Sequence, residues 1–144
     1  MSRPTSGPID RVGGALLLVL GVLALGTSIY LVFLRPPMLP EDLRFTGAVP
    51  QSLTPRMAEW LHVVFRTWGS FVAGFGLLLI AIGVHLLTGR EEALRRGAAA
   101  AIVIAFGTFL ASNVRLASDF LPVIAAEALL ALLTAGWLIL PRRQ

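Results

Sequence analysis

The sequence predicts an all-α, polytopic membrane protein whose four transmembrane helices form a single bundle. Its 144 residues are 56% hydrophobic and only 14% charged, and their mean hydropathy is +0.81. A soluble domain of this length would need more polar residues to cover its surface. The apolar residues also gather into four runs close to the length of about 20 residues that a membrane-spanning helix needs.

Short polar segments separate the four expected spans. The spans cover residues 12–34, 61–87, 97–114 and 120–140. The stretch Ala24-Leu25-Gly26 resembles the cleavage site of a signal peptide. The first apolar run continues unbroken past that stretch, however, so we interpret it as a span within one membrane domain, residues 12–140.

The arginines predict which side of the membrane the two tails occupy. With four spans, the tails at 1–11 and 141–144 share a side with the loop between the second and third spans. That side carries seven arginines: Arg3, Arg11, Arg90, Arg95, Arg96, Arg142 and Arg143. The opposite side carries four: Arg35, Arg44, Arg56 and Arg115. Since cytoplasmic loops are enriched in basic residues, we expect a bacterial inner-membrane protein with both termini in the cytoplasm.

The loop at 35–55 is the largest element expected outside the membrane. Its prolines at positions 36, 37 and 40 disfavour a helix and favour an extended course, and a polar, turn-rich stretch follows. Thr54 and Pro55 have the pattern of a helix N-cap followed by a proline at the first helical position. Gly89 is a suitable cap for the other end of that helix. The loop is either a plain connector or a cap over the bundle.

Small residues recur at every seventh position in two of the spans. They are Gly14, Gly21 and Ser28 in the first span, and Gly69, Gly76 and Gly83 in the second. Such repeats let membrane helices approach closely, although Gly and Ala are abundant throughout this chain. Arg66 lies on the same side of its helix as this stripe, so we expect it to face the packed interior. Ala131 and Thr134 place Glu127 on the inner face of the last span by the same argument.

Arg66 and Glu127 are the most unusual residues, because each charge interrupts a long apolar run. An ionisable group at membrane depth costs roughly 2.5–3.5 kcal/mol on insertion scales and is usually paired or functional. Arg66 comes six residues after Trp60 and Glu127 seven after Phe120, so we expect both about 10 Å inside their helices. Matched depth on parallel helices predicts an ion pair, acting as a structural clamp or as the floor of an outward-facing pocket; unpaired snorkelling is the remaining alternative. With nearby polar residues, the candidate ligand-binding set is Arg66, Glu127, His62, Asn113, Arg115 and Asp119.

The composition excludes several kinds of chemistry. The chain has no cysteine and no lysine, which excludes disulfides, thiolate metal sites and Schiff-base catalysis. His62 and His85 are 23 residues apart on one helix, roughly 34 Å, so they cannot ligate the same haem. We therefore expect no catalytic residue, metal site or cofactor. The net charge of +4 comes from arginines that flank the spans, which gives no reason to expect nucleic-acid binding.

Short stretches of the chain resemble the small four-helix membrane proteins of bacteria that are loosely DoxX-like. The stretches are Phe65-Arg66-Thr67-Trp68-Gly69-Ser70, running into a glycine-rich helix, and Val114-Arg115-Leu116 followed by Asp119, Pro122 and Glu127-Ala128-Leu129-Leu130. The resemblance covers the last three spans and implies a four-helix bundle, but no established activity. The loop at 35–55 is longer here than that pattern suggests.

Three classes of function remain open. The first, which the small size and the absence of catalytic motifs favour, is a non-catalytic accessory or structural subunit of a membrane assembly, with lipids and protein subunits as partners. The second is a binder or carrier of a lipid or small hydrophobic molecule, with an outward-facing pocket over Arg66 and Glu127. The third is a small membrane enzyme such as an isomerase, in which Glu127 would act as acid or base together with His62 or Asp119.

Overall fold

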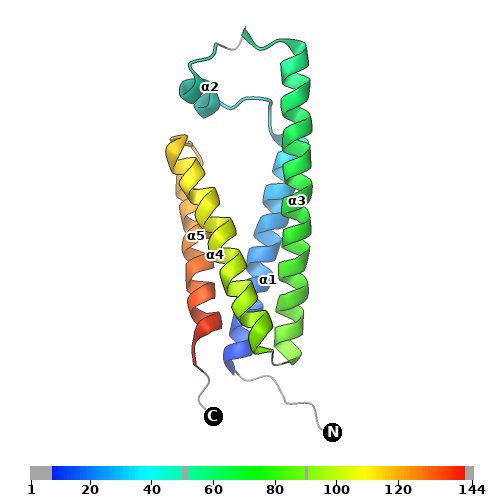
Figure 1. Cartoon of the computed structure of the whole chain (residues 1–144), viewed down its shortest axis with the longest axis vertical. Coiled ribbons are helices and arrows are strands. Elements are labelled where there is room, and N and C mark those ends of the chain that lie inside the picture. Colours follow the sequence, from blue (N-terminus) through cyan, green and yellow to red (C-terminus); the bar gives the residue numbers. More distant parts are fainter. Residues whose placement is uncertain (1–7, 50–51, 90, 142–144) are drawn as a thin grey trace.

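The computed structural model describes residues 8–49, 52–89 and 91–141 and shows four long helices with a short helix across one end of the bundle (Figure 1). The elements in chain order are α1 (Pro8–Ile29), the π-helical continuation η1 (Tyr30–Leu34), α2 (Pro40–Thr46), α3 (Pro55–Thr88), α4 (Glu92–Arg115) and α5 (Leu121–Ile139). No strand occurs among the described residues, and four segments are long and apolar enough to cross a membrane. The predicted all-α four-helix bundle is confirmed, and the chain has the fold of a multi-pass membrane protein.

The two ends of the bundle differ in what covers them. α1 begins and α5 ends at one end, which we call the terminal end, whereas α2 lies across the other, which we call the cap end (Figure 1). Four of the arginines whose distribution predicts the orientation in the membrane lie outside the described residues: Arg3, Arg90, Arg142 and Arg143.

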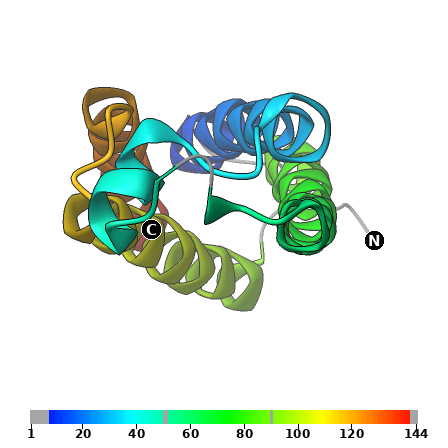
Figure 2. The same ribbon diagram turned by 90° about the horizontal axis from the view of Figure 1, so that it is seen from above.

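The bundle consists of two helix pairs that are joined unevenly. α1 packs along α3, α4 packs along α5, and α1 also contacts α5, whereas α3 and α4 touch at only a few positions. The latter two helices approach each other near the terminal end and diverge toward the cap end (Figures 1 and 2). Most fully buried side chains lie in the half of the bundle near the terminal end, among them Leu17, Leu79, Leu86, Ile102 and Leu138. One side of the bundle is therefore open between α3 and α4.

Glycines set the register of α1 against α3, as their spacing predicts. A Cβ atom on Gly21 would lie 2.8 Å from the carbonyl oxygen of Gly76, and one on Gly14 would lie 2.7 Å from that of Gly83. Both distances are too short for a real Cβ contact, so any larger residue would push the backbones apart. One repeat closer to the cap end, a Cβ on Gly69 would contact the carbonyl oxygen of Ser28 at 3.3 Å.

Two levels of contacts, one polar and one aromatic, bracket the apolar part of the bundle. At the terminal end Arg95 contacts Asp10 and the carbonyl of Leu140, and at the cap end the ring of Tyr30 packs on that of Phe120. Twenty residues separate these levels from Asp10 to Tyr30 and from Phe120 to Leu140, and α4 likewise runs twenty residues from Arg95 to its last residue, Arg115. Twenty helical residues span about 30 Å, the thickness of the hydrocarbon core of a bilayer.

The described part of the loop at 35–55 is a folded cap rather than a plain connector. Its first residues take the extended course that the prolines predict, with φ and ψ of −73° and 125° at Arg35. The following stretch, expected to form turns, is instead helix α2, because Pro40 occupies its first turn and Asp42 accepts a hydrogen bond from the backbone N–H of Leu39. α3 begins and ends as predicted, with Thr54 accepting from the N–H of Met57 and Gly89 as the C-cap.

Candidate functional site

Arg66 and Glu127 lie at different depths, contrary to the prediction. The glycine register places Arg66 opposite Leu31, at the cap-end boundary of the apolar region. Glu127 lies seven residues beyond Phe120 and hence level with Leu23. The two charges are thus separated along the bundle axis by eight residues, or roughly 12 Å. Trp60 is a poor reference for the depth of Arg66, because about the first two turns of α3 extend beyond the end of η1.

The predicted ion pair between Arg66 and Glu127 is not formed. Among the described residues neither side chain has an ion pair or a side-chain hydrogen bond, and α3 and α5 occupy diagonal corners of the bundle (Figure 2). Arg66 is exposed and does not face the packed interior. Glu127 is half-buried on the same face as the buried Ala131 and Thr134, as predicted.

The other four candidate residues make no polar side-chain contact with one another among the described residues. The amide of Asn113 donates to the carbonyl of Phe109 within its own helix. Asp119 forms an exposed ion pair with Arg44 of the cap at 2.7 Å. His62 and Arg115 are exposed on α3 and α4, respectively. Within the described part of the chain, neither His62 nor Asp119 forms an ion pair or side-chain hydrogen bond with Glu127, and no cluster of three potential metal ligands occurs there.

Polar contacts of the cap tie the two helix pairs together at the end where the helices diverge. On the α1–α3 side, Arg35 forms a 2.7 Å ion pair with Asp42 and its guanidinium lies 3.5 Å from the centre of the Phe65 ring. On the α4–α5 side, Glu41 is only 2% exposed and accepts a 3.1 Å hydrogen bond from the hydroxyl of Ser118. Together with the ion pair of Arg44, these contacts fix α2 over the turn between α4 and α5. The sequence did not suggest this docking, because its partners are more than 70 residues apart.

The sequence also did not predict a second polar cluster, which lies at the terminal end. Arg95 is 1% exposed and lies 3.5 Å from the carboxylate of Asp10, which is equally buried. It also pairs with Glu92 at 3.0 Å and donates to the carbonyl of Leu140 at 3.4 Å. We interpreted Arg95 as a topology signal, yet it shares a helix face with the buried Ala98, Ala99 and Ile102, and that spacing was the available clue.

An apolar cleft opens where α3 and α4 separate. Its volume is about 420 Å³, and apolar side chains line nearly all of it. α3 contributes Phe75, Leu78, Leu79 and Ile82, whereas α4 and the residues before it contribute Glu91, Ala93, Leu94, Gly97, Ala98 and Ala101. A Cβ atom on Gly97 would meet no other atom within 4 Å, so the cleft wall has unfilled space at that position. Neither Arg66 nor Glu127 lines the cleft, and the predicted pocket over those two residues is not observed there.

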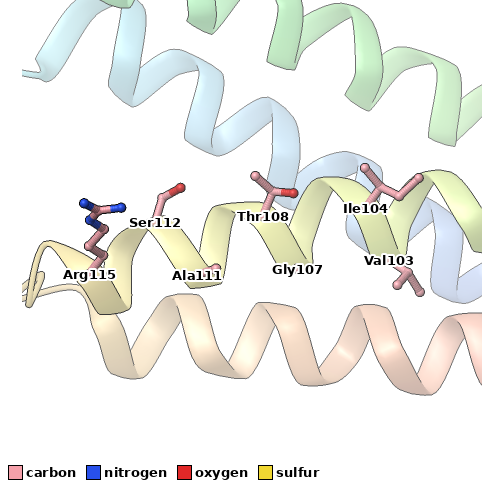
Figure 3. Close-up of a pocket in the computed structure, with 7 residues that line it drawn as sticks. All are labelled: Val103, Ile104, Gly107, Thr108, Ala111, Ser112 and Arg115. Carbon is pink, nitrogen blue, oxygen red and sulfur yellow. The ribbon is translucent and has the colours of Figure 1, made fainter.

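A separate groove of about 510 Å³ runs along the half of α4 near the cap end. The lining residues are Val103, Ile104, Gly107, Thr108, Ala111, Ser112 and Arg115. The side chains of Arg115, Ser112, Thr108 and Ile104 project from the same side of the helix (Figure 3). Of the six candidate ligand-binding residues, only Arg115 lines either depression.

Fold and site together define a four-helix membrane bundle with an apolar cleft between two of its helices. Comparison of the chain with protein-family models, with curated proteins and with solved structures finds no match. The resemblance to DoxX-like proteins therefore stays a prediction.

Proposed function

We propose that the protein is a non-catalytic membrane protein that binds a lipid or another small hydrophobic molecule in the cleft between α3 and α4. The observation that carries this proposal is the cleft itself, an apolar depression formed where two neighbouring helices lack close contact. Its volume of about 420 Å³ lies in the range of ligand pockets, and such pockets are usually apolar. In a bilayer this side of the bundle would face the acyl chains, so a hydrophobic molecule could enter without crossing water.

The cellular setting is part of the same proposal. We place the protein in the inner membrane of a bacterial cell, with the terminal end in the cytoplasm and α2 outside. The support is the arginine count, in which seven arginines lie before, between or after the spans on the terminal side. Because Arg66 lies at the cap-end boundary, the count is seven arginines on the terminal side against five on the cap side.

The cleft proposal is tested by filling the cleft. Gly97→Leu would occupy the unfilled space beside Phe75 and Leu78, whereas Gly136→Leu adds the same side chain to α5, where a Cβ also meets nothing within 4 Å. Native mass spectrometry of gently extracted protein should show a retained hydrophobic molecule in the wild type and the Gly136 variant. The Gly97 variant should have lost it. Equal retention in both variants, or a ligand-free wild type, would contradict the proposal.

A second candidate function, an accessory subunit of a membrane assembly, is supported by the first turns of α3. Met57 and Trp60 are each at least half-exposed on turns that extend beyond η1, where no other long helix covers them. Exposed apolar side chains outside the hydrocarbon core are typical of protein contacts. The same mass spectra test this candidate, because a partner subunit would add its mass to that of the chain.

A further inference from the structure

The groove on α4 spans one leaflet of a bilayer. Arg115 ends the helix at the cap-end level, and Val103, at the other end of the groove, lies twelve residues deeper. Twelve helical residues correspond to roughly 18 Å, a little more than half of the 30 Å hydrocarbon core. The groove shares no lining residue with the cleft between α3 and α4, so the inference from it does not rest on the proposed function.

The chemistry of the groove changes in a fixed order with depth. Arg115 supplies a guanidinium at the boundary, Ser112 and Thr108 supply hydroxyls one and two turns deeper, and only alkyl groups remain at Ile104 and Val103. Gly107 leaves room at the middle, since a Cβ there would meet nothing within 4 Å. A single cation at headgroup depth above an uncharged track complements a molecule with one anionic end and a long alkyl remainder.

The polar groups of the groove have free hydrogen-bonding capacity. Within the described part of the chain, Arg115 has neither an ion pair nor a side-chain hydrogen bond, and the same holds for the hydroxyls of Ser112 and Thr108. The hydroxyls of Ser70 and Thr134, by contrast, donate to the carbonyl four residues earlier in their own helix. An unpaired polar group is costly in hydrocarbon, so these three side chains would gain from a polar ligand.

We propose that this groove binds an anionic phospholipid from the leaflet at the cap end. The phosphate accepts hydrogen bonds from the guanidinium of Arg115, the ester oxygens accept from Ser112 and Thr108, and an acyl chain follows the track past Gly107 to Val103. A neighbouring transmembrane helix is a poorer fit, because it would leave the guanidinium without an anion unless it carried a carboxylate at the same depth.

The test compares two arginine variants of the full-length protein. Native mass spectrometry would measure binding of phosphatidylglycerol and of phosphatidylcholine to the wild type, to Arg115→Gln and to Arg56→Gln. Arg56 is a matched control, because it is an exposed arginine at the cap end that lines neither depression. We expect the wild type and the Arg56 variant to prefer phosphatidylglycerol, and Arg115→Gln to reduce that preference roughly tenfold, the scale of one charge-assisted hydrogen bond.

Three results would overturn the proposal. The first is an equal loss of preference in the two arginine variants, which would indicate general charge attraction. The second is displacement of phosphatidylglycerol by millimolar inorganic phosphate, which would indicate an anion site without a lipid track. The third is a Gly107→Leu variant that keeps the lipid preference but dissociates an oligomer of the wild type, which would assign the groove to a second copy of the chain. Loss of lipid preference in Gly107→Leu without a change of oligomeric state supports the proposal.

Discussion

The guanidinium of Arg95 holds three parts of the chain together at the terminal end. It contacts Asp10 of α1, Glu92 of its own helix and the carbonyl of Leu140 at the end of α5. Its exposure of 1% means that the charge is almost completely removed from solvent. A buried cation is stabilised by the anions and acceptors that surround it. Here two carboxylates and a carbonyl surround the guanidinium, although its Nε makes no hydrogen bond among the described residues.

Replacing Arg95 should therefore be among the most destabilising substitutions in the chain. Arg95→Met keeps much of the volume but leaves the buried carboxylate of Asp10 without this cation, and we expect a loss of roughly 3–5 kcal/mol in unfolding free energy. Adding Asp10→Asn should recover part of the loss, because the two residues interact directly. Reversible unfolding in detergent, followed by circular dichroism, measures the wild type, the two single variants and the double variant. Additive effects of the two substitutions would contradict a direct interaction.

The sequence predicts the environment of some charged residues in the bundle and not of others. The inward face of Glu127 followed from helical periodicity, because Ala131 and Thr134 mark that face. The depth of Arg66 did not follow, because hydropathy gives no sharp boundary for a helix that continues beyond the membrane. The burial of Arg95 was obscured for a related reason: arginines beside a span are common topology signals, and only the contact with Asp10 identifies this one as part of the core.

At the scale of elements, the packing of α1 on α3 depends on glycine rather than on large apolar side chains. Helices in a bilayer gain no hydrophobic energy from association, so close backbone approach and the van der Waals contact that it allows stabilise the pair. The seven-residue repeat keeps three such approaches on one face of each helix. The glycine face of α3 therefore packs against α1. The face that carries Phe75 and Leu78 lines the cleft.

Two glycines in α3 should respond differently to the same substitution. Gly76→Ala places a Cβ 2.9 Å from the carbonyl oxygen of Gly21 and should destabilise the bundle by roughly 1–3 kcal/mol. Gly74→Ala, two residues earlier, adds a methyl group where nothing lies within 4 Å, and should change stability by less than about 0.5 kcal/mol. Thermal unfolding in one detergent compares the two. A loss as large in the Gly74 variant would argue that helix α3 is sensitive to any change, and that close approach is not the cause.

The elements differ in how well the sequence predicts them. The four spans follow from local properties, namely apolar run length and caps such as Thr54, and the structure has them within a few residues of their expected ends. Helix α2 is not predicted, because three closely spaced prolines favour an extended segment. Pro40 is nevertheless compatible with the first turn of a helix. The docking of α2 could not be predicted, since Glu41 and Ser118 are 77 positions apart and no local pattern connects them.

At the scale of the whole molecule, two helix pairs are joined by different means at the two ends. Near the terminal end the four helices share a core and the Arg95 cluster, whereas at the cap end α2 bridges the pairs through the polar contacts of Arg35, Glu41 and Arg44. Between these two joints, α3 and α4 are free to stand apart. The cleft is a consequence of this architecture and does not depend on a special sequence motif.

The central claim is that the cleft between α3 and α4 holds a hydrophobic molecule, and covalent capture tests it most directly. The protein would be reconstituted in vesicles containing a phospholipid with a photoactivatable acyl chain, irradiated, and its adducts mapped by peptide mass spectrometry. We predict that adducts concentrate on Phe75–Ile82 and Gly97–Ala101 and decrease when excess ordinary lipid is added before irradiation, because that lipid competes for the same cleft. Adducts of equal density on the exposed leucines of α5, namely Leu129, Leu132 and Leu133, would show only bulk lipid contact and would contradict the claim.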